Sequence, residues 1–185
     1  MPGWWASHTA RENLSQRVKP RWRIDLGAAV YAGIAAGVSA TLFQILLWWI
    51  VGDDVPRHFD RDARLAAAIV LGRGALQASA SDWIVLGSAG GVHFALSISY
   101  AVMLAGFVAR RAMLPSLLAG GLFGLTLYAI NMYGFTIVFP WFADTRDPIT
   151  VAAHAAFGIS AAACYRTFTR ARKGSESDRD IQRRQ

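Results

Sequence analysis

The sequence predicts an all-α integral membrane protein with four transmembrane helices arranged as two tandem hairpins. The first observation behind this prediction is an uncharged run from Leu26 to Val51, in a chain that is 54% hydrophobic. A helix needs about 20 apolar residues to cross a bilayer, and lipid offers no partners to unpaired backbone groups. Segments at about 83–108, 115–139 and 149–168 have the same apolar character. We therefore expect a single transmembrane domain over residues 24–168.

The second observation is the distribution of basic residues. Most of the 19 Lys and Arg residues lie before residue 24, after residue 165 or in the turn at 110–111. Four crossings place these regions on one side of the membrane, and cytoplasmic loops carry an excess of Lys and Arg. We therefore expect 1–23 to be a basic cytoplasmic segment and 169–185 a disordered basic cytoplasmic tail. The net charge of +7 favours anionic lipids at that face, and not nucleic acid, as the partner.

The longest connection, residues 52–82, is expected to carry a short helix of its own. An amphipathic segment at about 61–72 begins near Asp60 and Asp62, either of which can cap its first turn, and Gly72 can end it. This helix would be about 17 Å long, which is too short to span the bilayer. We expect it to lie in the interface of the first extracytoplasmic loop. A re-entrant half-helix is the alternative.

The first and third predicted helices share a pattern of small residues. Gly33 and Gly37 form a GxxxG spacing in the first helix, and Gly120 and Gly124 form the same spacing in the third. Small residues at this spacing let two helix backbones approach closely. The second and fourth helices also resemble each other, so the sequence predicts an internal repeat of two hairpins. The four glycines are expected to be helix-packing residues that face each other across the axis between the halves.

Polar side chains recur at similar depth in all four predicted helices. Counting 1.5 Å per residue from the helix ends places four of them in the outer half of the bilayer. Such groups usually face the interior of a helix bundle. With two serines from the same helices they form the expected polar intramembrane cluster, which consists of Gln44, His93, Asn131, His154, Ser99 and Ser160.

Three interpretations of this cluster are open at the level of sequence. The side chains can bond across helices as packing contacts. They can line a cavity for a proton, water or a small solute, and histidines, which titrate near neutral pH, would make such a cavity an acid sensor on the outward side. His93 and His154 can also be the axial ligands of one b-type haem.

The chain carries no enzyme signature. It lacks HExxH, GxSxG and P-loop motifs, and it has no GxGxxG following a strand. We therefore expect a non-enzymatic membrane protein with no metal and no cofactor, the haem alternative apart. Its expected partners are the lipid bilayer and either a second copy of itself or a larger membrane complex. With haem bound, it would be an electron-transfer subunit of such a complex.

Four short motifs carry a family resemblance. They are AGIAAGVSA at 32–40, HFALSISYA at 93–101, LLAGG at 117–121 and His154 in the last predicted helix. In these motifs the chain resembles the YagU-like family of small bacterial inner-membrane proteins. The resemblance implies a multi-pass protein of the bacterial inner membrane with a role in acid or envelope stress, and it supplies no catalytic residues. Residues 52–82 depart from the family in length and composition.

Overall fold

The described part of the chain is all-helical. The computed structural model describes residues 24–77 and 82–183, and within these ranges it contains no strand. Four helical stretches are long and apolar enough to cross a membrane: Leu26–Val51, Asp82–Val108, Met113–Ile137 and Pro148–Arg172. The predicted all-α class and the four predicted spans are confirmed. The predicted basic segment 1–23 lies outside the described residues.

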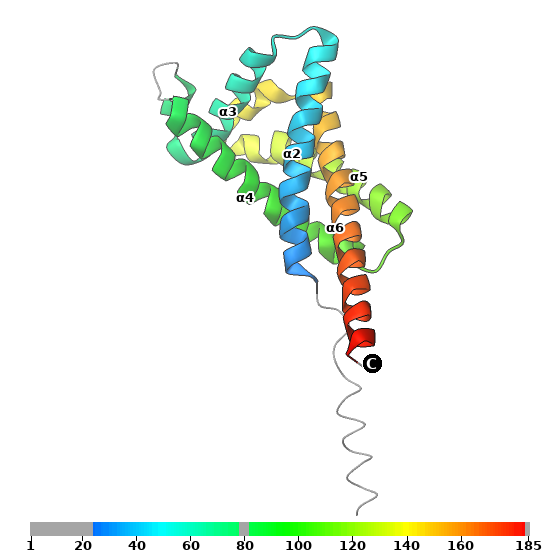
Figure 1. Cartoon of the computed structure of the whole chain (residues 1–185). Helices are drawn as coiled ribbons and strands as arrows, with labels where there is room; N and C mark the ends of the chain where they lie inside the picture. Colours follow the sequence, from blue (N-terminus) through cyan, green and yellow to red (C-terminus); the bar gives the residue numbers. More distant parts are fainter. Residues whose placement is uncertain (1–23, 78–81, 184–185) are drawn as a thin grey trace, which may run out of the picture.

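Five α-helices make up most of the fold (Figure 1). They are α2 (Leu26–Val51), α3 (Val55–Leu71), α4 (Asp82–Val108), α5 (Met113–Ala129) and α6 (Pro148–Gln182). Helices α2 and α6 lie side by side and run in opposite directions, while α4 and α5 slant across them. The start of α2, the α4–α5 turn and the end of α6 lie at one end of the molecule, here called the terminal end. Helix α3 lies at the opposite end, here called the α3 end.

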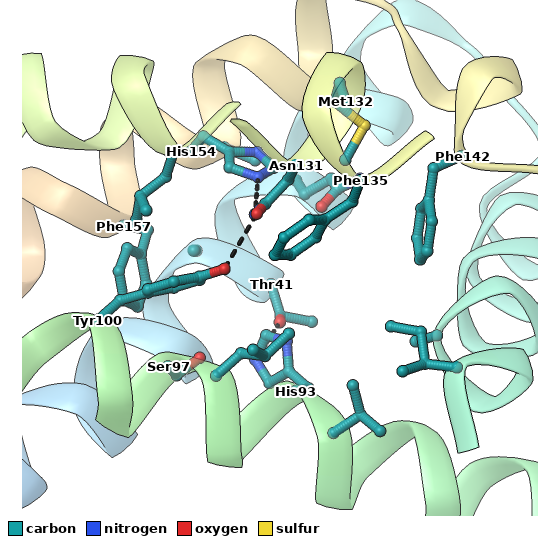
Figure 2. A pocket seen from close by; sticks show the side chains of 18 residues that line it. Thr41, His93, Ser97, Tyr100, Asn131, Met132, Phe135, Phe142, His154 and Phe157 are labelled. Carbon is teal, nitrogen blue, oxygen red and sulfur yellow. Dashed lines mark hydrogen bonds between the residues drawn. The ribbon is translucent and has the colours of Figure 1, made fainter. Parts of the chain in front are cut away.

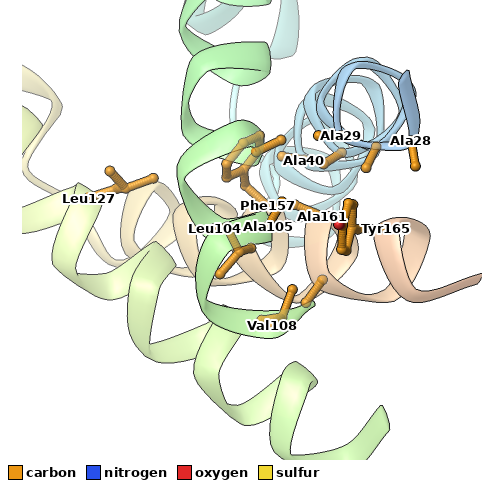
Figure 3. Packing of buried hydrophobic residues seen from close by; sticks show 14 residues of the cluster. Ala28, Ala29, Ala40, Leu104, Ala105, Val108, Leu127, Phe157, Ala161 and Tyr165 are labelled. Atoms are coloured by element: carbon orange, nitrogen blue, oxygen red, sulfur yellow. The ribbon is translucent and has the colours of Figure 1, made fainter. Parts of the chain in front are cut away.

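A core of small residues closes the terminal end. One face of α2 contributes buried alanines at 28, 29, 32 and 36, and they pack with residues from the last turns of α4 and from the middle of α6 (Figure 3). Leu104 and Val108 of α4 and Tyr165 of α6 are the larger members of this cluster. Small residues allow the helix backbones to approach closely, so dispersion contacts replace contacts with lipid.

The first glycine pair packs on α4. A Cβ built on Gly33 would lie 2.7 Å from the Ile98 Cα atom and 2.9 Å from the Ser97 carbonyl oxygen. A Cβ on Gly37 would lie 2.9 Å from Ser97 Oγ and 3.0 Å from His93 Nε2. A Cβ at Gly33 would meet the backbone of α4, so glycine there sets the separation of α2 and α4, whereas the atoms nearest Gly37 belong to side chains.

The second glycine pair packs on α6. A Cβ on Gly120 would collide with the carbonyl oxygen of Gly158, and one on Gly124 with the carbonyl oxygen of His154. The expectation that the two glycine pairs face each other is therefore wrong, because each pair contacts the following helix of its own half. His93 and His154 occupy corresponding places in the two contacts, against Gly37 and Gly124.

Helix α3 begins earlier than expected. Its first residue is Val55, and Asp54, not Asp60 or Asp62, caps it by accepting a hydrogen bond from the Arg57 N–H at 3.2 Å. Pro56 in the first turn favours this start. Its fixed φ suits a helix, and the N–H that proline lacks would have no partner within the helix at this position. The helix ends at Gly72, whose φ of 75° is readily adopted only by glycine.

The last two spans differ from the predicted 115–139 and 149–168. Helix α5 ends at Ala129, and the chain continues as a π turn, Ile130–Gly134, and a 3-10 turn, Phe135–Ile137. Helix α6 continues to Gln182, into the tail that was expected to be disordered. Once a helix is nucleated, each added residue gains a hydrogen bond at little further cost, and no proline interrupts the chain there.

The irregular end of α5 is held by a residue from the next connection. Arg146 donates from Nε to the Met132 carbonyl oxygen at 2.8 Å and from an Nη atom to Thr136 Oγ1 at 2.9 Å. Its guanidinium also lies 4.4 Å from the centre of the Tyr133 ring. The first of these contacts satisfies a backbone carbonyl that a regular helix would have paired internally.

Candidate functional site

Two adjoining chambers lie between the helices, towards the α3 end. The small chamber has a volume of about 210 Å³ and the large chamber about 450 Å³. Thr41, Gln44, His93, Met132 and His154 are among the residues that line both chambers, so the two chambers adjoin, and together they are here called the cavity. Ligand pockets typically measure about 300–1,000 Å³ and are mostly apolar with a few polar groups. This cavity has that size and that character.

Four of the six predicted cluster residues line the cavity. Gln44, His93, Asn131 and His154 are all on the wall of the small chamber. Ser99 and Ser160 line neither chamber. The Ser99 hydroxyl donates instead to the Ala95 carbonyl oxygen, on an exposed face of α4.

Helical spacing explains this division. His93, Ser97 and Tyr100 follow an i, i+4, i+7 pattern and therefore share one face of α4, which is the face that lines the small chamber. Ser99, six residues after His93, falls on another face, and Ser160 has the same relation to His154. Applying this spacing to the sequence would have replaced Ser99 with Ser97 and added Tyr100.

A chain of hydrogen bonds runs along one wall (Figure 2). Tyr100 donates to Asn131 Oδ1 at 2.9 Å, and Asn131 Nδ2 lies 3.4 Å from His154 Nε2. His154 Nδ1 lies 2.8 Å from the Thr150 carbonyl oxygen. Because a carbonyl can only accept, Nδ1 carries the proton and Nε2 of the neutral ring accepts from Asn131. The hydrogen bonds along this wall therefore run in one direction, from Tyr100 through Asn131 and His154 to Thr150. They fix the tautomer and the orientation of the His154 ring.

His93 lies on the opposite wall from His154 (Figure 2). Its Nε2 atom is 3.5 Å from Thr41 Oγ1, and the ring packs edge-to-face on Phe94 with 5.1 Å between centroids. The same Nε2 atom is the one close to Gly37. Thr41 and Gly37 both belong to α2, so the His93 ring is turned towards that helix.

Helix α3 brings a charged pair to the large chamber. Asp62 lines its wall, accepts from Gln44 Nε2 at 3.1 Å through Oδ2, and accepts from Arg61 Nε at 2.9 Å through Oδ1. Burial raises the pKa of the Asp62 carboxyl above its ordinary value, against the opposing effect of Arg61. Its side chain is still 28% exposed, so the chamber wall reaches the surface here. Sequence reasoning assigned Asp62 to a helix cap and missed this position.

The opposite end is closed by contacts between helix ends. Asp25, before α2, accepts two hydrogen bonds from Arg172 Nη1, at 2.7 and 2.8 Å, and the Asp25 N–H donates to Tyr165 Oη at 3.3 Å. Arg166 donates to the Ala109 carbonyl oxygen at 2.8 Å. The Ala28 N–H and Arg172 together hold the pKa of Asp25 below its ordinary value. With the alanine core, these contacts separate the cavity from the terminal end.

The histidines do not fit a shared haem as they are arranged. Axial ligation requires both imidazoles to face one iron atom between them. His154 Nε2 is directed at Asn131, whereas His93 Nε2 is directed at Thr41. Among the described residues there is no group of three or more His, Cys, Asp or Glu residues that would hold a metal ion.

The fold and the cavity together define a multi-pass membrane protein with an intramembrane cavity. Comparisons of the chain with protein-family models, with described proteins and with solved structures found no match.

Proposed function

We propose that this protein is a non-enzymatic protein of the bacterial inner membrane that binds a small molecule in its intramembrane cavity. The observation that carries the proposal is a hydrogen-bonded polar wall inside a mostly apolar cavity that is closed at the terminal end. Ionisable groups within a bilayer are costly and usually serve a substrate or proton pathway. Binding from one side is the first step of transport, and transport is the role we favour.

The proposed orientation has both termini in the cytoplasm and the cavity open on the outward side. It is supported by the excess of Lys and Arg in the segments at the terminal end. In this orientation α2 with α4 and α5 with α6 are two hairpins, and α3 lies in the outer interface. Arg110, Arg111 and Arg170 then lie where anionic lipid head groups are found.

Acid or envelope stress is the proposed physiological setting. The resemblance to the YagU-like family suggests it, and the two histidines on the walls of an outward cavity are side chains that can bind a proton. A second copy of the chain or a larger membrane complex is the proposed partner, because four helices leave much apolar surface exposed.

Thiol labelling tests the cavity and its orientation together. In a Cys164→Ala background, Thr41→Cys places a thiol on the cavity wall, and Ala105→Cys places one in the closed core as a matched control. A membrane-impermeant thiol reagent is added to right-side-out and to inverted vesicles. We expect the thiol at 41 to react only in right-side-out vesicles and the thiol at 105 in neither.

Two results contradict the proposal. Equal protection of both thiols would reduce the polar residues to packing contacts between helices. Reaction of the thiol at 41 from the cytoplasmic side would reverse the orientation.

The b-type haem alternative has its own test. A Soret band in the purified protein, lost in both His93→Ala and His154→Ala, would establish an electron-transfer subunit instead. Such a result would require His93 to turn away from Thr41 and towards the cavity.

A further inference from the structure

We infer that the large chamber binds a single-chain lipid with an uncharged head group, which enters sideways from the bilayer between α2 and α4. The inference rests on the proposed function, because it names the class of molecule that the cavity binds.

The lining of the large chamber includes side chains on the outer face of the molecule. Val38 and Leu42 of α2 are 43% and 60% exposed, and Leu86 and Phe94 of α4 are 44% and 37% exposed. A residue can both line a chamber and be this exposed only where the chamber meets the surface. These four apolar residues therefore mark a side opening, and the spans that carry them place this opening against lipid acyl chains.

The opening arises because α2 and α4 diverge. They are in close contact at Gly33 and Gly37, towards the terminal end, where a Cβ on either glycine would lie within 3.0 Å of an atom of α4. Further towards the α3 end, α4 leans away from α2 (Figure 1). There Gly90, which lines the large chamber, has no atom beyond its own helix backbone and chain neighbours within 4 Å of where a Cβ would lie. Helix α3 occupies part of this gap, and the remainder is the large chamber.

The polar groups of the chamber select an uncharged head. The wall offers the hydroxyl of Thr41, the amide of Gln44 and the imidazole of His93, all of which can form hydrogen bonds. Its one carboxylate, Asp62, is already paired with Arg61 at 2.8 Å. An ion brought into this site would lose its hydration without gaining an opposite charge. A hydroxyl or ester head would be hydrogen-bonded there, with its chain extending through the side opening.

Gly90 and Gly87 provide a matched pair of variants. Both lie on α4 with open space within 4 Å of where a Cβ would lie, so a side chain can begin at either position without a clash. Only Gly90 lines the large chamber. Gly90→Leu therefore fills the chamber, whereas Gly87→Leu adds the same side chain outside it.

Trp48 supplies the readout. It lines the large chamber and is only 3% exposed, so ordinary bilayer lipid does not touch it. The probe is a monoacylglycerol with a dibrominated chain, since bromine quenches tryptophan fluorescence on close contact. The fraction of quenching that is absent in Trp48→Phe reports occupancy of the chamber. We expect this fraction to saturate with probe concentration in the parent and in Gly87→Leu. In Gly90→Leu, half-maximal quenching should need about tenfold more probe.

Three outcomes overturn the inference: equal quenching in Gly90→Leu and the parent, equal Trp48 quenching by a dibrominated two-chain phosphatidylcholine, or tighter binding of the ionised dibrominated fatty acid than of the monoacylglycerol. Thiol labelling at position 41 is a separate measurement. Labelling without specific quenching would leave the proposed function standing and refute the lipid, while quenching without labelling would keep the lipid and refute the proposed opening to the outward aqueous side.

Discussion

Replacing Gly124 with alanine should force α5 away from α6. The new Cβ would collide with the His154 carbonyl oxygen and lie 2.9 Å from its carbonyl carbon and 3.0 Å from the Ala155 Cα atom. All three are backbone atoms, so no side-chain rotation can relieve the contact. The helices must instead separate until these distances reach the ordinary range of 3.4–4 Å.

The cost follows from this overpacking. Inserting a methyl group into a tightly packed interface costs about 1–3 kcal/mol. For a chain of this size, each kcal/mol lowers Tm by about 2–4 °C, so a decrease of roughly 2–12 °C is expected. Gly37→Ala should cost less, because its new Cβ meets the side-chain atoms Ser97 Oγ and His93 Nε2, which can shift.

The assay is thermal unfolding of the purified protein in detergent, with Gly87→Ala as the control. A Cβ at Gly87 meets nothing within 4 Å, and alanine is the better helix former by about 1 kcal/mol, so this variant should melt at or above the parent temperature. If Gly124→Ala has the same Tm as Gly87→Ala, the close contact of α5 and α6 is not what holds the two helices together.

Three further predictions address charged residues outside the spans. Burial raises the pKa of Asp62, so the folded protein binds this proton more tightly than the unfolded chain does. The stabilisation is lost as pH rises from about 3.8, so the Tm of the parent should fall relative to that of Asp62→Asn over this range. Parallel pH profiles of the two Tm values would contradict this. Arg146→Gln removes the donor to Met132 and should speed amide exchange over residues 130–137 about fivefold, for a loss of about 1 kcal/mol; unchanged exchange would show that the irregular segment holds itself. Asp25→Ala removes the acceptor of the Ala28 N–H and should lower stability by about 1 kcal/mol in denaturant titration, while Asp25→Asn, which keeps a capping oxygen, should lose less. Equal losses would assign the effect to the Arg172 pair instead.

The sequence by itself determined the number and the approximate limits of the membrane-spanning segments. Helix α2 begins at Leu26 and ends at Val51 as predicted, and α4 begins within one residue of the prediction. The physical reason is local: a segment in lipid must bond its own backbone groups, so apolar length alone predicts a helix. The break after Ala129 has no such signal, because Ile130–Gly134 contains neither a proline nor a charge and is held by Arg146 from another segment.

The cavity could be predicted only in part. Depth along each helix identified Gln44, His93, Asn131 and His154, which all line it. Depth does not say which way a side chain points, so Ser99 was included and Ser97, Tyr100 and Asp62 were missed. The biochemical role of the residues that line the cavity stays a prediction, as do the family resemblance and the stress setting.

Only the tertiary structure decided which helices touch and where they part. Four glycines at one spacing looked interchangeable in the sequence, yet Gly33 and Gly37 pack on α4 while Gly120 and Gly124 pack on α6. Apolar helices in lipid gain little from simple burial, so their pairing depends on shape and close contact between residues distant in the chain. Hydropathy carries no information about that fit, and the cavity exists where the fit between α2 and α4 ends.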